Sequence, residues 1–161
     1  MIFIECKADE TLVSSFNIDA NDIHHSNGKG GVCENLSKAT NAIGIIDKDI
    51  GSSQPRYLDL LEKIENNKDF EIYVDKNKLN KLILLCPKLE GWLIKACKEA
   101  NVDLNKYKLS DDEKRLHAII NLNVNRLEKV LALLPGRSSL YSKLEKHIKI
   151  PYNPLGDDDG S

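Results

Sequence analysis

Acidic side chains follow two short apolar segments of this 161-residue chain. Glu5 comes directly after "MIFI", and Asp47 and Asp49 come after "AIGII". Short apolar runs bounded by polar residues are typical of buried strands. The carboxyl ends of parallel strands meet at one edge of a sheet, and ligands bind outside that edge. We therefore expect Glu5, Asp47 and Asp49 to lie close together in the fold.

Carboxylates gathered at a sheet edge are suited to a divalent metal ion. Mg²⁺ prefers oxygen ligands and commonly takes one or two carboxylates, with water and substrate phosphates completing its shell. Alternate side chains of an extended Asp47-x-Asp49 segment can point the same way, and Gly51 lets the backbone turn closely beside an ion. The sequence thus predicts that Glu5, Asp47 and Asp49 bind Mg²⁺ or Mn²⁺. The alternative is a polar turn, where Asp is common.

Another acidic residue, Glu90, lies in the stretch "CPKLEGW", where an apolar run ends and an amphipathic helix begins. Glu90 is a candidate site residue, and Lys88 is a possible phosphate ligand. The alternative for Glu90 is a purely structural one, because a carboxylate in the first turn of a helix complements the helix dipole.

The stretch "HHSNGKGG" places glycines before a predicted helix. Backbone N–H groups at such a helix start can bind phosphate, so Gly28, Lys29 and Gly30 are possible phosphate-binding residues. The stretch lacks the spacing of a nucleotide-binding P-loop, and an ordinary turn is the favoured alternative. His24 or His25 could act as a general acid or base, although both are typical of a polar strand end.

The order of the predicted elements indicates an α/β fold with a mainly parallel, Rossmann-like sheet flanked by helices and followed by a helical C-terminal region. The expected strands lie near residues 1–6, 22–26, 42–47, 70–75 and 81–86. The expected helices of the first half lie near residues 8–16, 27–40 and 56–67. Right-handed crossovers would place the carboxyl ends of the parallel strands along one edge.

The length is that of one domain. We expect an α/β core over residues 1–87 and a helical region over residues 88–150 packed on the same domain. The tail over residues 151–161 is acidic and rich in Pro and Gly, so we expect it to be disordered.

The composition is that of an ordinary globular protein, with 41% apolar and 30% charged residues. No apolar run approaches the ~18 residues that span a bilayer, and the first residues lack the pattern of a signal peptide. We therefore expect a cytoplasmic protein without a membrane partner. The four cysteines lack the spacing of a zinc site and are interpreted as structural, as is His117, which lies beside apolar residues of a helix.

Charge is distributed unevenly along the chain. Residues 1–75 contain 7 Lys/Arg and 14 Asp/Glu, whereas residues 76–150 contain 16 Lys/Arg and 8 Asp/Glu. An acidic half can hold cations while a basic half attracts polyanions such as nucleic acid. Alternatively, the lysines simply cover solvated helix surfaces.

The segments "FIECKADETLV" and "GIIDKDIG" together resemble the toprim domain, the metal-binding fold of topoisomerases, primases and several small nucleases. The family pattern is an apolar strand followed by Glu, often Gly, and Asp; Glu5, Cys6 and Asp9 stand at those places. The second pattern, an apolar strand with Asp-x-Asp and then Gly, is matched by the 47–51 segment. Cys6 departs from the usual glycine. For Asp9, the N-cap of a helix is favoured over a metal ligand.

The resemblance covers residues 1–87 and implies phosphodiester chemistry with Mg²⁺ or Mn²⁺. Small stand-alone members resemble RNA-processing ribonucleases and nucleases of phage-defence or toxin-like systems. A Pro-x-x-Glu-x-Trp stretch like that around Glu90 also occurs in small bacterial toprim-like proteins, where its Glu resembles a further acidic residue of the site. The resemblance therefore implies that Glu90 is a catalytic residue together with Glu5, Asp47 and Asp49.

The function that follows is a Mg²⁺-dependent nuclease acting on RNA or DNA. The alternative is a non-catalytic, metal- or nucleotide-binding partner subunit of a larger complex, which would dock on a protein partner or form a homo-oligomer. A flavodoxin-like or response-regulator-like domain shares the strand–helix order, but the order of the acids, with Glu first and the Asp pair later, argues against it.

Overall fold

The computed structural model describes residues 1–156, and residues 157–161 lie outside the described part. It is an α/β protein with one six-stranded mixed sheet and six α-helices in the described part. The strands are β1 (Ile2–Ile4), β2 (Ile23–His25), β3 (Ile43–Asp47), β4 (Glu62–Asn66), β5 (Phe70–Asp75) and β6 (Asn80–Leu85). The helices are α1 (Lys7–Ser14), α2 (Gly28–Lys38), α3 (Leu89–Glu99), α4 (Glu113–Ile120), α5 (Val124–Leu131) and α6 (Ser139–Lys149).

The strand order in the sheet is β2-β1-β3-β6-β5-β4. The pairings β2/β1, β1/β3 and β3/β6 are parallel, as the sequence predicts, while β6/β5 and β5/β4 are antiparallel. The parallel half therefore carries β1 and β3 side by side, with β6 next to β3. In this half the carboxyl ends of four strands, β2, β1, β3 and β6, share one edge.

The helix predicted over residues 56–67 is wrong. This segment forms a short 3₁₀ helix, η2 (Arg56–Leu60), and then strand β4, which pairs with β5. The apolar spacing of the segment fits one helix face, yet Leu60 and Ile64 are exposed. The sheet prevails over the local pattern because β4 supplies hydrogen-bond partners to the backbone of β5, which would otherwise be an open edge.

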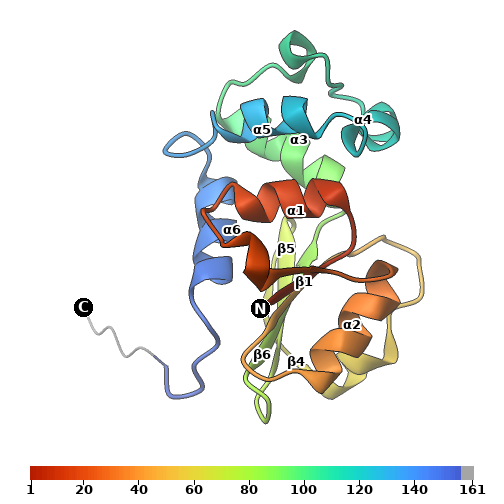
Figure 1. The fold of residues 1–161 in the computed structure, drawn as a ribbon, viewed down its shortest axis with the longest axis vertical. Coiled ribbons are helices and arrows are strands. Elements are labelled where there is room, and N and C mark those ends of the chain that lie inside the picture. The colour runs from red at the N-terminus through yellow and green to blue at the C-terminus, as the bar shows by residue number, and fades with distance from the viewer. Residues whose placement is uncertain (157–161) are drawn as a thin grey trace.

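Apolar side chains pack on both faces of the sheet. One face carries the larger core, in which Ile4 and Ile45 of the sheet pack with residues of α1, α3, α5 and α6. The other face carries a smaller core, in which Phe3 and Ile46 pack with α2 and η2. This alternation follows the period of two along a strand. Figure 1 shows α2 on its own side of the sheet, with α3, α4 and α5 gathered at one end of the molecule.

The larger core crosses the predicted boundary at residue 87. Ile83 and Leu85 of β6 belong to the same apolar cluster as Trp92 and Leu93 of α3. Lys81 of β6 also donates hydrogen bonds to carbonyl oxygens at the end of α6. The chain from residue 151 to 156 forms neither helix nor strand, and the remainder of the predicted disordered tail lies outside the described residues. No helix within residues 1–156 is both long and apolar enough to cross a membrane.

Candidate functional site

Glu5 and Asp47 come together at the carboxyl edge of the parallel strands. Asp47 is the last residue of β3, and Glu5 is the first residue after β1, the neighbouring strand. Glu5 Oε1 accepts a hydrogen bond of 3.1 Å from the backbone N–H of Asp47. The predicted convergence of these two residues, which are 42 positions apart, is thus present in the structure.

Asp9 belongs to the same neighbourhood and also stabilises the start of α1. It is the third residue of that helix, and its Oδ2 accepts hydrogen bonds from the backbone N–H groups of Cys6 (3.0 Å) and Glu5 (3.3 Å). This is a capping role from inside the first turn; the N-cap position itself is Cys6. The buried Asp9 carboxylate holds the backbone of Glu5 and thereby fixes where that side chain leaves the main chain.

The start of α3 brings Glu90 to this edge. Asp47 Oδ1 accepts a hydrogen bond of 2.8 Å from the backbone N–H of Leu89, the first residue of α3. Glu90 follows and is buried. Its Oε1 lies 2.8 Å from His117 Nδ1 on α4, while its buried Oε2 has no hydrogen-bond partner among the described residues. A buried carboxylate oxygen without a partner is costly unless another group neutralises it.

Three carboxylates at this edge, those of Glu5, Asp9 and Asp47, have raised pKa values. Burial is the main cause that raises the pKa of Asp47 to about 8, and the charges of Asp9, Glu90 and Glu5 add to it, against the hydrogen bond from Leu89. Burial likewise raises the pKa values of Glu5 and Asp9, each with help from a neighbouring carboxylate. We name Glu5, Asp9, Asp47 and Glu90 the acidic cluster. Burial and the mutual repulsion of the carboxylates make it costly to hold all members of this cluster ionised at once.

Asp49 makes a different set of contacts. Its backbone has a left-handed φ of 50°, and its carboxylate points to two lysines, with Oδ2 lying 3.3 Å from Lys29 Nζ and Oδ1 3.5 Å from Lys88 Nζ. Asp49 is near enough to Glu5 to raise the pKa of that residue slightly. The structure therefore separates the Asp47-x-Asp49 pair: Asp47 joins the acidic cluster, and Asp49 lies beside it in an ion-paired group.

The residues proposed to bind phosphate flank the acidic cluster. Gly28, Lys29 and Gly30 form the first turn of α2, and Lys88 is the N-cap of α3. Lys29 Nζ also donates to the carbonyl oxygen of Lys48 at 3.1 Å. The two lysines thus meet at Asp49, although 59 positions separate them in sequence.

His117 is the residue at this edge that sequence reasoning missed, because the sequence indicates only a structural residue on an amphipathic helix. It contacts Glu90 from α4, 27 positions away, and no local motif marks that contact. His25 instead forms an exposed pair with Glu10, and His24 lies against the ring of Phe3.

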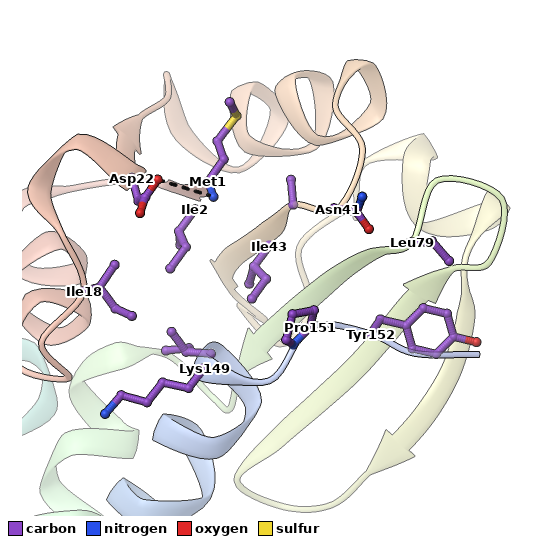
Figure 2. Close-up of a pocket in the computed structure, with 12 residues that line it drawn as sticks. Met1, Ile2, Ile18, Asp22, Asn41, Ile43, Leu79, Lys149, Pro151 and Tyr152 are labelled. Carbon is purple, nitrogen blue, oxygen red and sulfur yellow. Dashed lines mark ion pairs between the residues drawn. The ribbon is translucent and has the colours of Figure 1, made fainter. Parts of the chain in front are cut away.

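One cavity adjoins the site, and a second lies at the opposite edge of the sheet. The first, of about 590 Å³, adjoins the acidic cluster and is lined by Lys88, Glu90, Asp112, Glu113, Lys114 and His117. The second, of about 220 Å³, lies at the beginnings of β1 and β3. Figure 2 shows that its lining is largely apolar, with one ion pair between the Met1 amino group and Asp22. None of the predicted site residues lines this second cavity.

Within residues 1–156, no three His, Cys, Asp or Glu side chains are already spaced to ligate one ion. A scan against protein-family models, a search of curated proteins and a search of solved structures each found no match to this chain.

Proposed function

We propose that the protein is a Mg²⁺-dependent nuclease with a toprim-like core that hydrolyses phosphodiester bonds of RNA or DNA. The observation that carries this proposal is the acidic cluster, in which Glu5, Asp9, Asp47 and Glu90 converge at the carboxyl ends of β1 and β3. Burial raises the pKa values of Glu5, Asp9 and Asp47, and carboxylates with raised pKa values that gather in one place are candidates for a functional site. The order of these acids in the chain is the one that resembles toprim proteins.

Glu5 and Asp47 are the residues that would hold the metal ion. Each uses one carboxylate oxygen for a backbone hydrogen bond, and the other oxygen makes no hydrogen bond within the described residues. Two carboxylates suffice for Mg²⁺ when water and substrate phosphate supply the other ligands. The partnerless Glu90 Oε2 supports the fit, because a nearby cation would offset its negative charge. When bound, Mg²⁺ polarises the phosphate and orients the attacking water.

The chain's own groups position this site. The N–H of Leu89 fixes the orientation of the Asp47 carboxylate, and the Asp47 N–H fixes that of Glu5. Because the pKa of Asp47 is raised to about 8, a metal ion would have to displace its proton below that pH, so metal affinity increases with pH. Lys88 and Lys114 line the neighbouring cavity and could contact the phosphate backbone.

Cleavage assays with Mg²⁺ or Mn²⁺ test the proposal on RNA, single-stranded DNA and plasmid. Glu5→Gln and Asp47→Asn keep the hydrogen-bond acceptors of these side chains but remove their charge, so both should lower cleavage at least about a hundredfold. Asp59→Asn is the matched control, because Asp59 is an exposed residue of η2 that contributes nothing to the acidic cluster.

Calorimetric titration with Mn²⁺ gives a second readout that does not depend on activity. Wild type should bind Mn²⁺, and Glu5→Gln and Asp47→Asn should weaken that binding. If wild type binds Mn²⁺ but cuts none of the substrates, the partner-subunit alternative replaces the nuclease. If it neither binds nor cuts, the metal site itself is wrong.

A further inference from the structure

Two lysines from distant parts of the chain share one carboxylate beside the acidic cluster. Lys29 comes from the first turn of α2 and Lys88 from the N-cap of α3. Each contacts a different oxygen of Asp49, at 3.3 Å and 3.5 Å. With two ammonium groups and one carboxylate, the group carries a net charge of +1. Within reach of four carboxylates, such a positive group is well placed for an anion that must approach the acidic cluster.

The Lys29 side chain and the Lys88 backbone are held in place by contacts that do not involve the Asp49 carboxylate. Lys29 Nζ donates to the carbonyl oxygen of Lys48 and to Gln54 Oε1, at 3.1 Å and 3.4 Å, and only 13% of its side chain is exposed. The backbone of Lys88 is fixed as the N-cap of α3, where its carbonyl oxygen accepts from the N–H of Trp92. The fold therefore sets the place of the Lys29 ammonium group and the point from which the Lys88 side chain extends, and Asp49 contacts both side chains.

The geometry of the Asp49 contacts matches that of a phosphodiester. A carboxylate offers two oxygens with one shared negative charge, as do the two non-bridging oxygens of a backbone phosphate, and lysine binds either group as a point charge. The Asp49 side chain is 37% exposed and Lys88 is 42% exposed, so an incoming anion can reach the pair from solvent. An ion pair exposed to this degree on both sides, as between Lys88 and Asp49, is weak and can be exchanged.

We propose that Lys29 and Lys88 form a binding site for one backbone phosphate of a nucleic acid, and that the Asp49 carboxylate occupies this site until the phosphate displaces it. The identity of the anion as nucleic acid rests on the proposed function, whereas the competition between Asp49 and an anion does not. Asp49 then acts as a competitor that lowers the affinity of the free protein for polyanions.

The test is the binding of a fluorescein-labelled single-stranded oligodeoxynucleotide, measured by anisotropy at low ionic strength in EDTA. Asp49→Asn removes the competing charge and keeps the shape of the side chain, so we expect binding about three- to tenfold tighter than that of wild type. Asp59→Asn makes the same change in net charge on an exposed residue of η2 and should stay within about twofold of wild type.

A double variant tests whether the gain in affinity depends on the charge of Lys88. In Asp49→Asn/Lys88→Met the gain should disappear, because Met keeps the apolar stem of Lys88 but not its charge. The proposal is overturned if Asp49→Asn binds no tighter than Asp59→Asn, or if the double variant keeps the gain. Since no metal is present and no cleavage is measured, loss of the nuclease proposal in the assays above is a separate outcome from failure of this one.

Discussion

Asp47 links the chemistry of the site to the stability of the fold. Its pKa of about 8 lies far above its ordinary value of 3.8, chiefly because of burial. Between these two values the unfolded chain releases the proton while the folded protein keeps it. Stability must therefore fall as pH rises through this window, by up to about 1.4 kcal/mol per pH unit from this residue. The raised pKa values of Glu5 and Asp9 act in the same direction.

We expect Asp47→Asn to make stability in EDTA less dependent on pH and to make the protein more stable than wild type near about pH 8. The amide oxygen can still accept the hydrogen bond from the N–H of Leu89, so the fold is kept. Urea denaturation at about pH 5 and about pH 8 measures the effect. The Asp59→Asn control should show the same change in the free energy of unfolding with pH as wild type. If Asp47→Asn also showed that same change, burial would not be raising the pKa of Asp47.

At the residue scale, sequence reasoning found the groups that lie at strand ends and missed those brought in by packing. Glu5 and Asp47 could be placed together because neighbouring parallel strands end at the same edge. The sequence predicts Asp49 as a metal ligand beside Asp47, but its backbone has a left-handed conformation and its side chain contacts two lysines instead. His117 reaches Glu90 only through the packing of α4 against α3, which no local pattern encodes.

Among the elements, the C-terminal end of α2 is hydrogen-bonded to a buried side chain of β6. Asn80 Nδ2 donates to the carbonyl oxygens of Leu36 (2.8 Å) and Ala39 (3.0 Å), and its Oδ1 accepts from the N–H of Ala42 at 3.0 Å. Asn80→Ala would leave these three backbone groups without their partner. We expect a loss of about 2–4 kcal/mol in the free energy of unfolding, measured by chemical denaturation. Asn77→Ala, at an exposed position of the turn before β6, should stay within about 0.5 kcal/mol of wild type.

The start of α3 depends on a close approach at Gly91. A Cβ there would lie 2.9 Å from Pro87 Cδ and 3.3 Å from Glu113 Cδ on α4, and the proline ring cannot rotate away. Gly91→Ala should therefore move the start of α3 and cost about 1–3 kcal/mol. Because this helix start holds both Asp47 and Glu90, metal-dependent cleavage should fall about tenfold or more.

Gly30→Ala serves as the stability control for this change, since a Cβ at that position of α2 meets nothing within 4 Å. It should be neutral or stabilising by up to about 1 kcal/mol in thermal denaturation. If Gly91→Ala were as stable and as active as wild type, the close packing of Gly91 against Pro87 and Glu113 would not position the site.

The elements themselves could be predicted wherever burial and local pattern agree. The strands near residues 2–4, 43–47 and 80–85 and the four C-terminal helices form where their apolar spacing indicates. The helix prediction for residues 56–67 fails because the apolar side chains that suggest a helix, those of Tyr57, Leu58 and Leu61, lie within η2 or directly after it. The residues that follow form strand β4, which pairs with β5. Tertiary hydrogen bonding of this kind decides between helix and strand in short ambiguous segments.

For the molecule as a whole, the larger core joins the sheet to the C-terminal helices. Ile83 and Leu85 of β6 share one apolar cluster with Trp92 of α3 and Leu144 of α6. The acidic cluster is built across the same junction, because Asp47 comes from the sheet and Glu90 from α3. Separating the two parts would therefore remove the core and the site together.

We accordingly expect the sheet and the C-terminal helices to unfold in one cooperative transition. Trp92 is the single tryptophan of the chain and is fully buried, so its fluorescence reports on the helical region, while far-UV circular dichroism reports on all secondary structure. The two signals should give the same urea midpoint. Leu144→Ala removes core contacts from α6 and should lower the free energy of unfolding by about 2–5 kcal/mol. Both urea midpoints should then fall by the same amount. A fluorescence midpoint that falls alone would show that the helical region unfolds separately, and that a site spanning the two parts can be lost while the sheet persists.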